Sequence, residues 1–71
     1  MLMDAFIKGD VYIDDPFEQA KFRYEKDSGK VYRRFYGQPE EEILPSSSLY
    51  NDAIRTGKQI TREEYFRDRP S

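Results

Sequence analysis

The stretch between Lys21 and Gly37 holds the side chains of this 71-residue chain that are best suited to bind another molecule. It alternates basic and aromatic residues on both sides of a turn, and alternate residues of a β-strand point to the same face. Single-stranded nucleic acid is held by positive charge along its backbone and by rings that stack on its bases. One face of the predicted hairpin supplies both groups, through Lys21, Arg23, Lys30, Tyr32, Arg34 and Tyr36.

The same residue types also favour a protein partner. Tyr and Arg are enriched at the hot spots of protein interfaces, and a hairpin in a small domain leaves an edge strand that can pair with another chain. Near the C-terminus, Tyr65 and Phe66 are adjacent on a predicted short helix. They cannot both face the same core, so one of them is available for contact.

We therefore predict a non-enzymatic protein–protein interaction module, such as an adaptor, an inhibitor or a regulatory subunit. Its partner is another protein or a second copy of the chain in a homodimer. The alternative function is a single-stranded nucleic-acid-binding module that uses the basic and aromatic face. Small accessory proteins of this size are common in phages and other mobile elements, which is an argument from size and not from a motif.

Charge is segregated along the chain, although the formal net charge is only −2. Residues 20–36 carry six basic and two acidic side chains, a net charge of +4, whereas residues 1–19 and 37–54 each carry −4. This segregation opens a third interpretation, in which the acidic segments fold over the basic face and neutralise it. Tyr, Arg and Lys would then be ordinary residues of a strand face, with their stems covering neighbouring rings.

Catalysis and metal binding have little support. The chain has no His and no Cys, which removes the commonest general base, the commonest metal ligand, thiolate nucleophiles and disulfides. Adjacent carboxylates occur at residues 14–15 and 40–42, where a turn and an acidic connector explain them better than an acid/base pair. Asp10, Asp14, Asp15 and Glu18 match no calcium-loop spacing. We predict no enzyme, no cofactor, no metal site and no small-molecule substrate.

The hairpin that positions the basic face is the clearest sheet signal. Residues 20–25 and 30–36 are rich in the aromatic and β-branched types that favour strands, and residues 26–29 form a turn sequence ending in Gly29. A four-residue loop pairs Glu25 with Lys30, whereas a three-residue loop would place like charges opposite each other. The four-residue register gives the other face a core set interrupted by Arg33, namely Ala20, Phe22, Tyr24, Val31 and Phe35.

The segment before the hairpin leaves two alternatives. Residues 5–14 have the composition of one interrupted strand or two short strands, and their pairing with the hairpin is left open. Asp15, Pro16 and Glu18 then have the spacing of a helix start. A helix over residues 15–26 therefore competes with a short turn at residues 16–19 followed by a strand, and we favour the turn because the next residues are strand formers.

Two short helices complete the predicted fold. One covers about 49–56, capped by Ser47 or Ser48 and ended by Gly57, and the other covers about 62–68, where Thr61 and Glu64 have capping-box spacing. Both are too short to persist alone, so they must dock on the sheet. The predicted class is α+β: one domain over residues 1–71, with an antiparallel sheet of two to four strands and both helices against one face.

The N-terminal ten residues, MLMDAFIKGD, have neither the pattern of a signal peptide nor that of a membrane span. We accordingly expect a cytoplasmic protein that makes no membrane contact. The turn and capping patterns described above occur in many unrelated small proteins and indicate local structure only.

Overall fold

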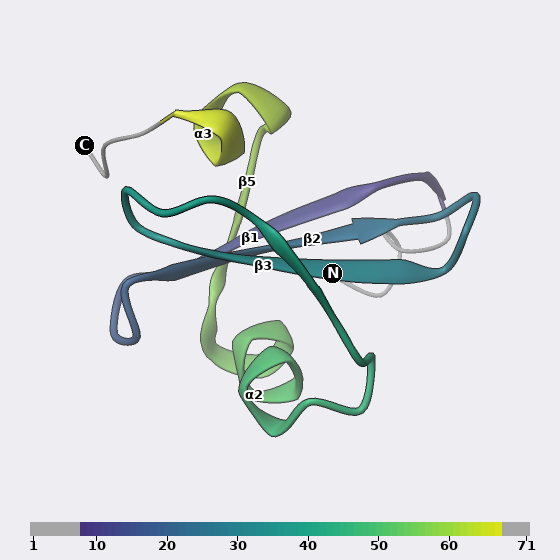
Figure 1. Cartoon of the computed structure of the whole chain (residues 1–71), viewed down its shortest axis with the longest axis horizontal. Helices are drawn as coiled ribbons and strands as arrows, with labels where there is room; N and C mark the ends of the chain where they lie inside the picture. The colour runs from purple at the N-terminus through teal and green to yellow at the C-terminus, as the bar shows by residue number, and fades with distance from the viewer. Residues whose placement is uncertain (1–7, 68–71) are drawn as a thin grey trace.

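A computed structural model of the chain, which describes residues 8–67, contains a five-stranded antiparallel sheet and two short helices (Figure 1). The strand order is β4-β3-β2-β1-β5, so the two edge strands are the shortest and the hairpin lies near the centre. The α+β class predicted from the sequence is confirmed. In chain order the elements are β1 (Val11–Asp15), β2 (Ala20–Glu25), β3 (Lys30–Phe35), β4 (Glu41–Ile43), α2 (Ser48–Thr56), β5 (Lys58–Ile60) and α3 (Arg62–Phe66).

The β2–β3 hairpin has the register that charge pairing predicted. Glu25 pairs with Lys30 and Phe22 with Arg33 across a four-residue loop. Gly29 takes a φ of 73° in this loop, a left-handed conformation that glycine adopts without a steric penalty, and its N–H donates to the carbonyl of Glu25 at 2.8 Å. The hairpin prediction, including its loop length, is therefore confirmed.

The competing helix over residues 15–26 is wrong. Residues 16–19 form a turn, and Asp15 caps that turn by accepting a hydrogen bond from the backbone N–H of Glu18. β2 then pairs on both sides, with Phe22 between Ile13 of β1 and Arg33 of β3. The backbone hydrogen bonds of a central strand and the burial of its side chains on both faces outweigh a local helix-start signal.

Neither edge strand was predicted from the sequence. β4 lies in the predicted acidic connector and pairs Ile43 with Val31, and β5 follows α2 and pairs Ile60 with Tyr12. Each has only three residues, so pairing with a longer neighbour forms it rather than any pattern of its own. Ile43 packs against the core, whereas Leu44 is 73% exposed.

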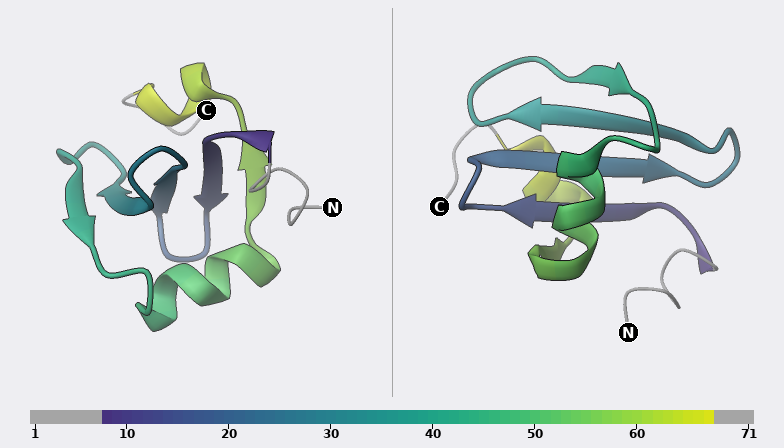
Figure 2. Two further views of the ribbon diagram at one scale, coloured as in Figure 1. Left: turned by 90° about the vertical axis from the view of Figure 1, so that its right-hand side faces the viewer. Right: turned by 90° about the horizontal axis from the view of Figure 1, so that it is seen from below.

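The two helices lie on opposite faces of the sheet, and the expectation that both cover one face is wrong (Figure 2). α2 packs Tyr50 against Phe22, with the ring centroids 5.8 Å apart. α3 packs Tyr65 against Tyr12 from the other side, at 5.5 Å. Strand alternation explains the difference, because Tyr12 points away from the main core beneath α2, which contains Val11, Ile13, Ala20, Phe22, Val31, Tyr50 and Ala53.

The helix boundaries follow local capping. α3 begins with the predicted capping box, in which Thr61 Oγ1 accepts from the N–H of Glu64 and the Thr61 N–H donates to the Glu64 carboxylate. Ser47 is the N-cap residue of α2 but makes no side-chain capping bond. α3 ends at Phe66, with Arg67 in an extended conformation as its C-cap, so it is shorter than the predicted helix over about 62–68. The predicted strand residues 5–7 lie outside the described residues. Within residues 8–67, no helix has the length and apolar composition needed to cross a membrane.

Gly57 gives a test of how tightly α2 packs on β1. A Cβ atom at Gly57 would lie 2.5 Å from the carbonyl oxygen of Ala53 and 2.7 Å from Cγ2 of Ile13. We expect Gly57→Ala to lower the free energy of unfolding by about 1–3 kcal/mol, because the backbone must shift to relieve this overlap. Urea denaturation measures the loss. Gly9→Ala, with open space around the added Cβ, is the matched control, and equal losses in the two variants would contradict the packing described.

Candidate functional site

The sheet brings the predicted basic and aromatic side chains to one face, the face covered by α3. They occupy alternate positions of β2 and β3, with Tyr36 just after the end of β3; Lys21 pairs with Arg34 and Arg23 with Tyr32. The geometric part of the prediction therefore holds. The structure also shows what these side chains contact, and for most of them the partner lies within the chain itself.

Lys21 and Arg34 hold the C-terminal end of α3. Lys21 is 5% exposed, and its Nζ donates to the carbonyl oxygens of Glu64 at 2.6 Å and Arg67 at 3.3 Å. Arg34 Nη1 donates to the carbonyl of Tyr65 at 3.1 Å. The last carbonyls of a helix have no intrahelical partners and attract cations. Burial lowers the pKa of Lys21. Because the amine is covered and bonded to two carbonyls, it is not available to a phosphate in solution.

Arg23 forms the centre of a second cluster beneath α3. Its guanidinium donates two hydrogen bonds to the Glu40 carboxylate, at 3.1 and 2.9 Å, and stacks on the ring of Tyr32 at 4.2 Å. The Tyr65 hydroxyl donates to the same carboxylate at 2.7 Å. The hydrogen bond from Arg23 holds the pKa of Glu40 below its usual value, and burial raises the pKa of Tyr65. Glu40 therefore joins the basic face to the acidic segment.

Tyr36 is joined to the other acidic segment. Its hydroxyl donates to Asp14 at 2.5 Å, and the Lys21 amine lies 5.8 Å from the centre of its ring. Burial, with this hydrogen bond, raises the pKa of Tyr36. Both acidic segments thus contact the basic face. The interpretation in which the acidic segments fold over this face and neutralise it therefore describes the contacts of Arg23 and Tyr36.

The remaining predicted site residues divide by exposure. Tyr65 is fully buried, while Phe66 is 45% exposed and has the guanidinium of Arg62 over its ring. Lys30 is exposed and Tyr32 is half-buried. That Lys30, Tyr32 or Phe66 contacts a partner stays a prediction.

The acidic residues before the hairpin have structural partners. Asp10 accepts a hydrogen bond from the N–H of Lys26 at 2.9 Å, Asp14 accepts from Tyr36, and Asp15 caps the turn. In the part of the chain that the structure describes, no three carboxylates gather closely enough to hold a metal ion. These contacts explain why Asp occurs at these three positions.

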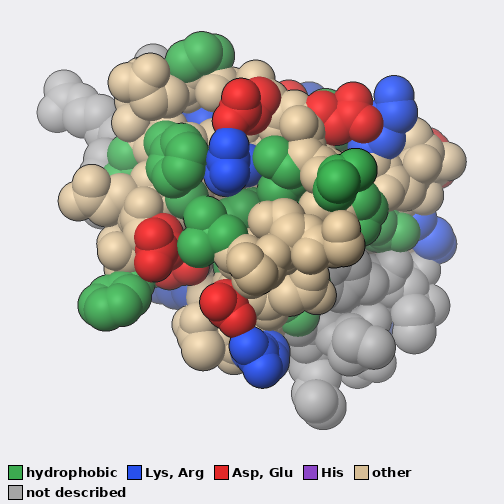
Figure 3. All heavy atoms as spheres, turned by 60° about the horizontal axis from the view of Figure 1, so that its bottom comes forward, with side chains coloured by type: hydrophobic (Ala, Val, Ile, Leu, Met, Phe, Trp, Pro, Cys, Tyr) green, Lys and Arg blue, Asp and Glu red, His purple; other side chains and the backbone are tan. Residues whose placement is uncertain are grey.

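Sequence reasoning missed one exposed aromatic residue. Phe17, in the turn between β1 and β2, is 94% exposed. Figure 3 brings the α2 side of the molecule forward and shows hydrophobic side chains beside carboxylates on this surface. The position of Phe17 in the sequence could have indicated its exposure, because a residue inside a tight turn belongs to neither alternating face of the sheet.

An α+β domain that engages Lys21, Arg23 and Arg34 internally and exposes large apolar side chains has the features of a protein-binding domain. Comparison with known proteins agrees: the Tis1 immunity protein family matches residues 3–69, and the chain belongs to this family. The chain is 44% identical over 64 residues to "Immune protein Tis1" of Pseudomonas aeruginosa (strain UCBPP-PA14), an alignment covering 87% of this chain and 83% of that protein.

A solved structure matches the fold as well. It is the crystal structure of the complex between the Type VI effector Tas1 and its immunity protein, in which a chain superposes with a TM-score of 0.81 at 44% identity. The match covers 86% of this chain and 83% of that chain. The family supports a protein-binding inhibitor class and a non-enzymatic protein, in agreement with the leading sequence prediction. It does not support the nucleic-acid alternative, whose phosphate-binding cations Lys21 and Arg23 are engaged within the fold.

The Arg23–Glu40 pair gives a test of the α3 face. We expect Glu40→Gln to lower the free energy of unfolding by about 1.5–3 kcal/mol, because a charge-assisted pair beneath α3 is lost. The depressed pKa of Glu40 implies stability that is present above its usual pKa of about 4.5 and is lost as the pH falls through the lower folded value. The variant should therefore lose less stability than wild type between about pH 5 and pH 3.

Chemical denaturation across this pH range measures both effects. The control is Glu42→Gln, which removes an exposed carboxylate from the same segment and should change stability by less than about 0.5 kcal/mol. If the two variants gave the same stability and the same acid dependence, the Glu40 cluster would contribute nothing to the fold.

Proposed function

We propose that this chain is an immunity protein that binds a type VI effector of the Tas1 kind and inhibits it by forming a stable complex. The observation that carries the proposal is the match, at 44% identity and a TM-score of 0.81, to a chain in the crystal structure of Tas1 with its immunity protein. The match includes most of both chains, so it concerns the whole domain and not one shared motif.

The physical character of the chain supports inhibition by binding. The hairpin register, the α3 capping box and the Arg23–Glu40 pair hold a short chain in one arrangement. A surface that is ordered before association loses little conformational entropy on binding, which favours tight complexes. Inhibition of this kind is stoichiometric, because each molecule of inhibitor occupies one molecule of effector.

The chain is also suited to a reducing compartment. It has no Cys, so its stability owes nothing to disulfides, and we propose that it acts in the cytoplasm. A homodimer remains part of the proposal as the form of the unbound protein. Light scattering of the free chain and of its effector complex distinguishes a dimer from a monomer.

Binding to Tas1 tests the proposed function. We expect purified wild-type chain to bind immobilised Tas1 with a Kd on the order of 1 µM or tighter, as for a protein interface of ordinary size, and to compete with the Pseudomonas aeruginosa Tis1 protein. It should also restore growth to a bacterial host in which Tas1 production limits growth. Tis1 serves as the positive control, and failure of this chain to bind where Tis1 binds would overturn the proposal.

A salt series distinguishes protein binding from phosphate binding. The Kd for Tas1 should change little between 50 and 200 mM salt if apolar contacts dominate, whereas binding to phosphates weakens by roughly 10³-fold or more over that range when six or more of them are contacted. A single-stranded oligonucleotide is the matched probe. Oligonucleotide binding that equals Tas1 binding at about 150 mM salt would return the nucleic-acid alternative to consideration.

A further inference from the structure

The turn between β1 and β2 presents an aromatic side chain to solvent. Phe17 is 94% exposed, the largest exposed fraction among the large hydrophobic residues that the structure describes. It contributes nothing to the core and sits on the side of the molecule opposite the occupied basic face. An aromatic residue in such a position is a candidate anchor, because burial of one ring removes a large apolar area from water.

The turn holds Phe17 on a constrained backbone. Pro16 fixes its own φ, and Gln19 has a φ of 54°, in the left-handed region. The Gln19 N–H donates to the Pro16 carbonyl at 3.3 Å, and the Gln19 carbonyl accepts from the N–H of Tyr36 at 2.9 Å. The carboxylate of Asp15, which is buried, accepts a hydrogen bond from the backbone N–H of Glu18, and this bond closes the turn. The backbone that carries the anchor is therefore ordered before a partner arrives.

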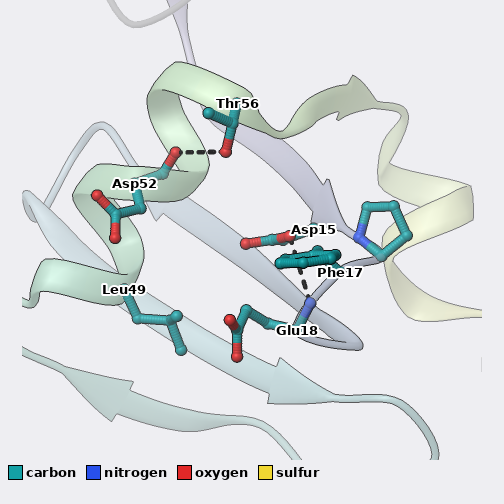
Figure 4. Close-up of a pocket in the computed structure, with 7 residues that line it drawn as sticks. Asp15, Phe17, Glu18, Leu49, Asp52 and Thr56 are labelled. Atoms are coloured by element: carbon teal, nitrogen blue, oxygen red, sulfur yellow. Dashed lines mark hydrogen bonds between the residues drawn. The ribbon is translucent and has the colours of Figure 1, made fainter.

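A hollow of about 480 Å³ lies between this turn and α2 (Figure 4). The figure shows Leu49 and Asp52 of α2 on one side and Phe17 and Glu18 of the turn on the other. Leu49 gives the hollow an apolar wall. Its complete lining is Asp15, Pro16, Phe17, Glu18, Leu49, Asp52 and Thr56.

The charge of the hollow limits which partner can fill it. Every ionisable side chain in the lining is acidic: Asp15, Glu18 and Asp52. Asp52 is partly compensated by Arg55, which donates to it at 2.6 Å, whereas Asp15 is committed to the turn. Glu18 is exposed at the rim. A Lys or Arg side chain from a partner would complement this wall, with its stem along Leu49 and its charge between Glu18 and Asp52.

We infer that the Phe17 turn and the adjacent hollow form the surface that docks the type VI effector. Phe17 enters an apolar pocket of the effector, and a basic side chain of the effector enters the hollow beside α2. This inference rests on the proposed function and adds the location and chemistry of the interface. It places that interface away from the face of Lys21, Arg23 and Arg34, whose cations are bound within the chain.

A second exposed apolar side chain, Leu44, lies just before the start of α2. A second hollow there is lined by Glu42, Ile43, Leu44, Ser46 and Ser47, and Leu44 is 73% exposed. Phe17 and Leu44 thus supply apolar area on two sides of α2, with an acidic rim at Glu18. A central apolar anchor surrounded by polar residues is the usual anatomy of a protein interface.

The test measures the affinity of full-length chain variants for immobilised Tas1. We expect Phe17→Ala to raise the Kd at least tenfold, mainly through a faster off-rate, and Phe17→Leu to retain most of the affinity. Because Phe17 is exposed, both variants should unfold at the wild-type temperature. Glu63→Gln is the matched control: it changes an exposed residue of α3, on the other face of the sheet, and should leave the Kd within twofold of wild type. Lys30→Glu is measured beside it, because Lys30 is the exposed predicted contact residue of the basic face.

Charge is tested separately. Glu18→Lys should slow association at least threefold at low salt, and the difference should shrink at about 0.5 M salt because screening removes the steering. A contrary result would be an equal or faster on-rate for this variant. That result would overturn the basic character assigned to the partner.

The possible results distinguish a failure of the proposed docking surface from a failure of the proposed immunity function. If wild type binds Tas1 and Phe17→Ala binds within twofold of it, the docking surface is wrong while the immunity function stands. If Lys30→Glu loses affinity and Phe17→Ala does not, the effector docks on the hairpin face instead. If wild type itself does not bind, the proposed function and the docking surface both fail.

Discussion

The pair between Arg23 and Glu40 is the interaction on which the α3 side of the molecule depends. Arg23 lies in a central strand with its side chain largely covered, and a covered guanidinium needs a hydrogen-bonded counter-charge. Glu40 supplies it, and in doing so draws the segment after β3 back over the sheet, where β4 can pair. The same carboxylate accepts from Tyr65, so one residue joins the hairpin, the β3–β4 connection and α3.

The two faces of the sheet are consequently stabilised by different kinds of interaction. Beneath α2 the contacts are apolar, with Phe22 and Tyr50 at the centre, and burial raises the pKa of Tyr50 to about 12. Beneath α3 they are polar, and cations satisfy the last carbonyls of a helix only five residues long. A chain this short cannot build two apolar cores, so it covers the second face with charges that it pairs internally.

The elements that sequence could predict are those specified by neighbouring residues. The β2–β3 register followed from avoiding like charges, and the α3 start followed from Thr61 and Glu64, because both depend on contacts within a few residues along the chain. β4, β5 and the opposite placement of the helices depend on pairing between distant segments, which local patterns do not encode. The candidate basic face was located correctly as a face. Its internal partners, Glu40 and the α3 carbonyls, come from 17 or more residues away in sequence and became visible only in three dimensions.

The basic and aromatic stretch has a positioning role that its composition did not suggest. The backbone N–H of Tyr36 donates a hydrogen bond to the carbonyl of Gln19, and the Tyr36 hydroxyl donates one to Asp14. The end of the hairpin therefore fixes both sides of the β1–β2 turn. Phe17 projects from that turn. The residues that looked like a binding face therefore stabilise the backbone that presents the anchor on the other side. An inhibitor built in this way keeps its contact residue outside the core, where its identity can change with the partner without a cost in folding stability.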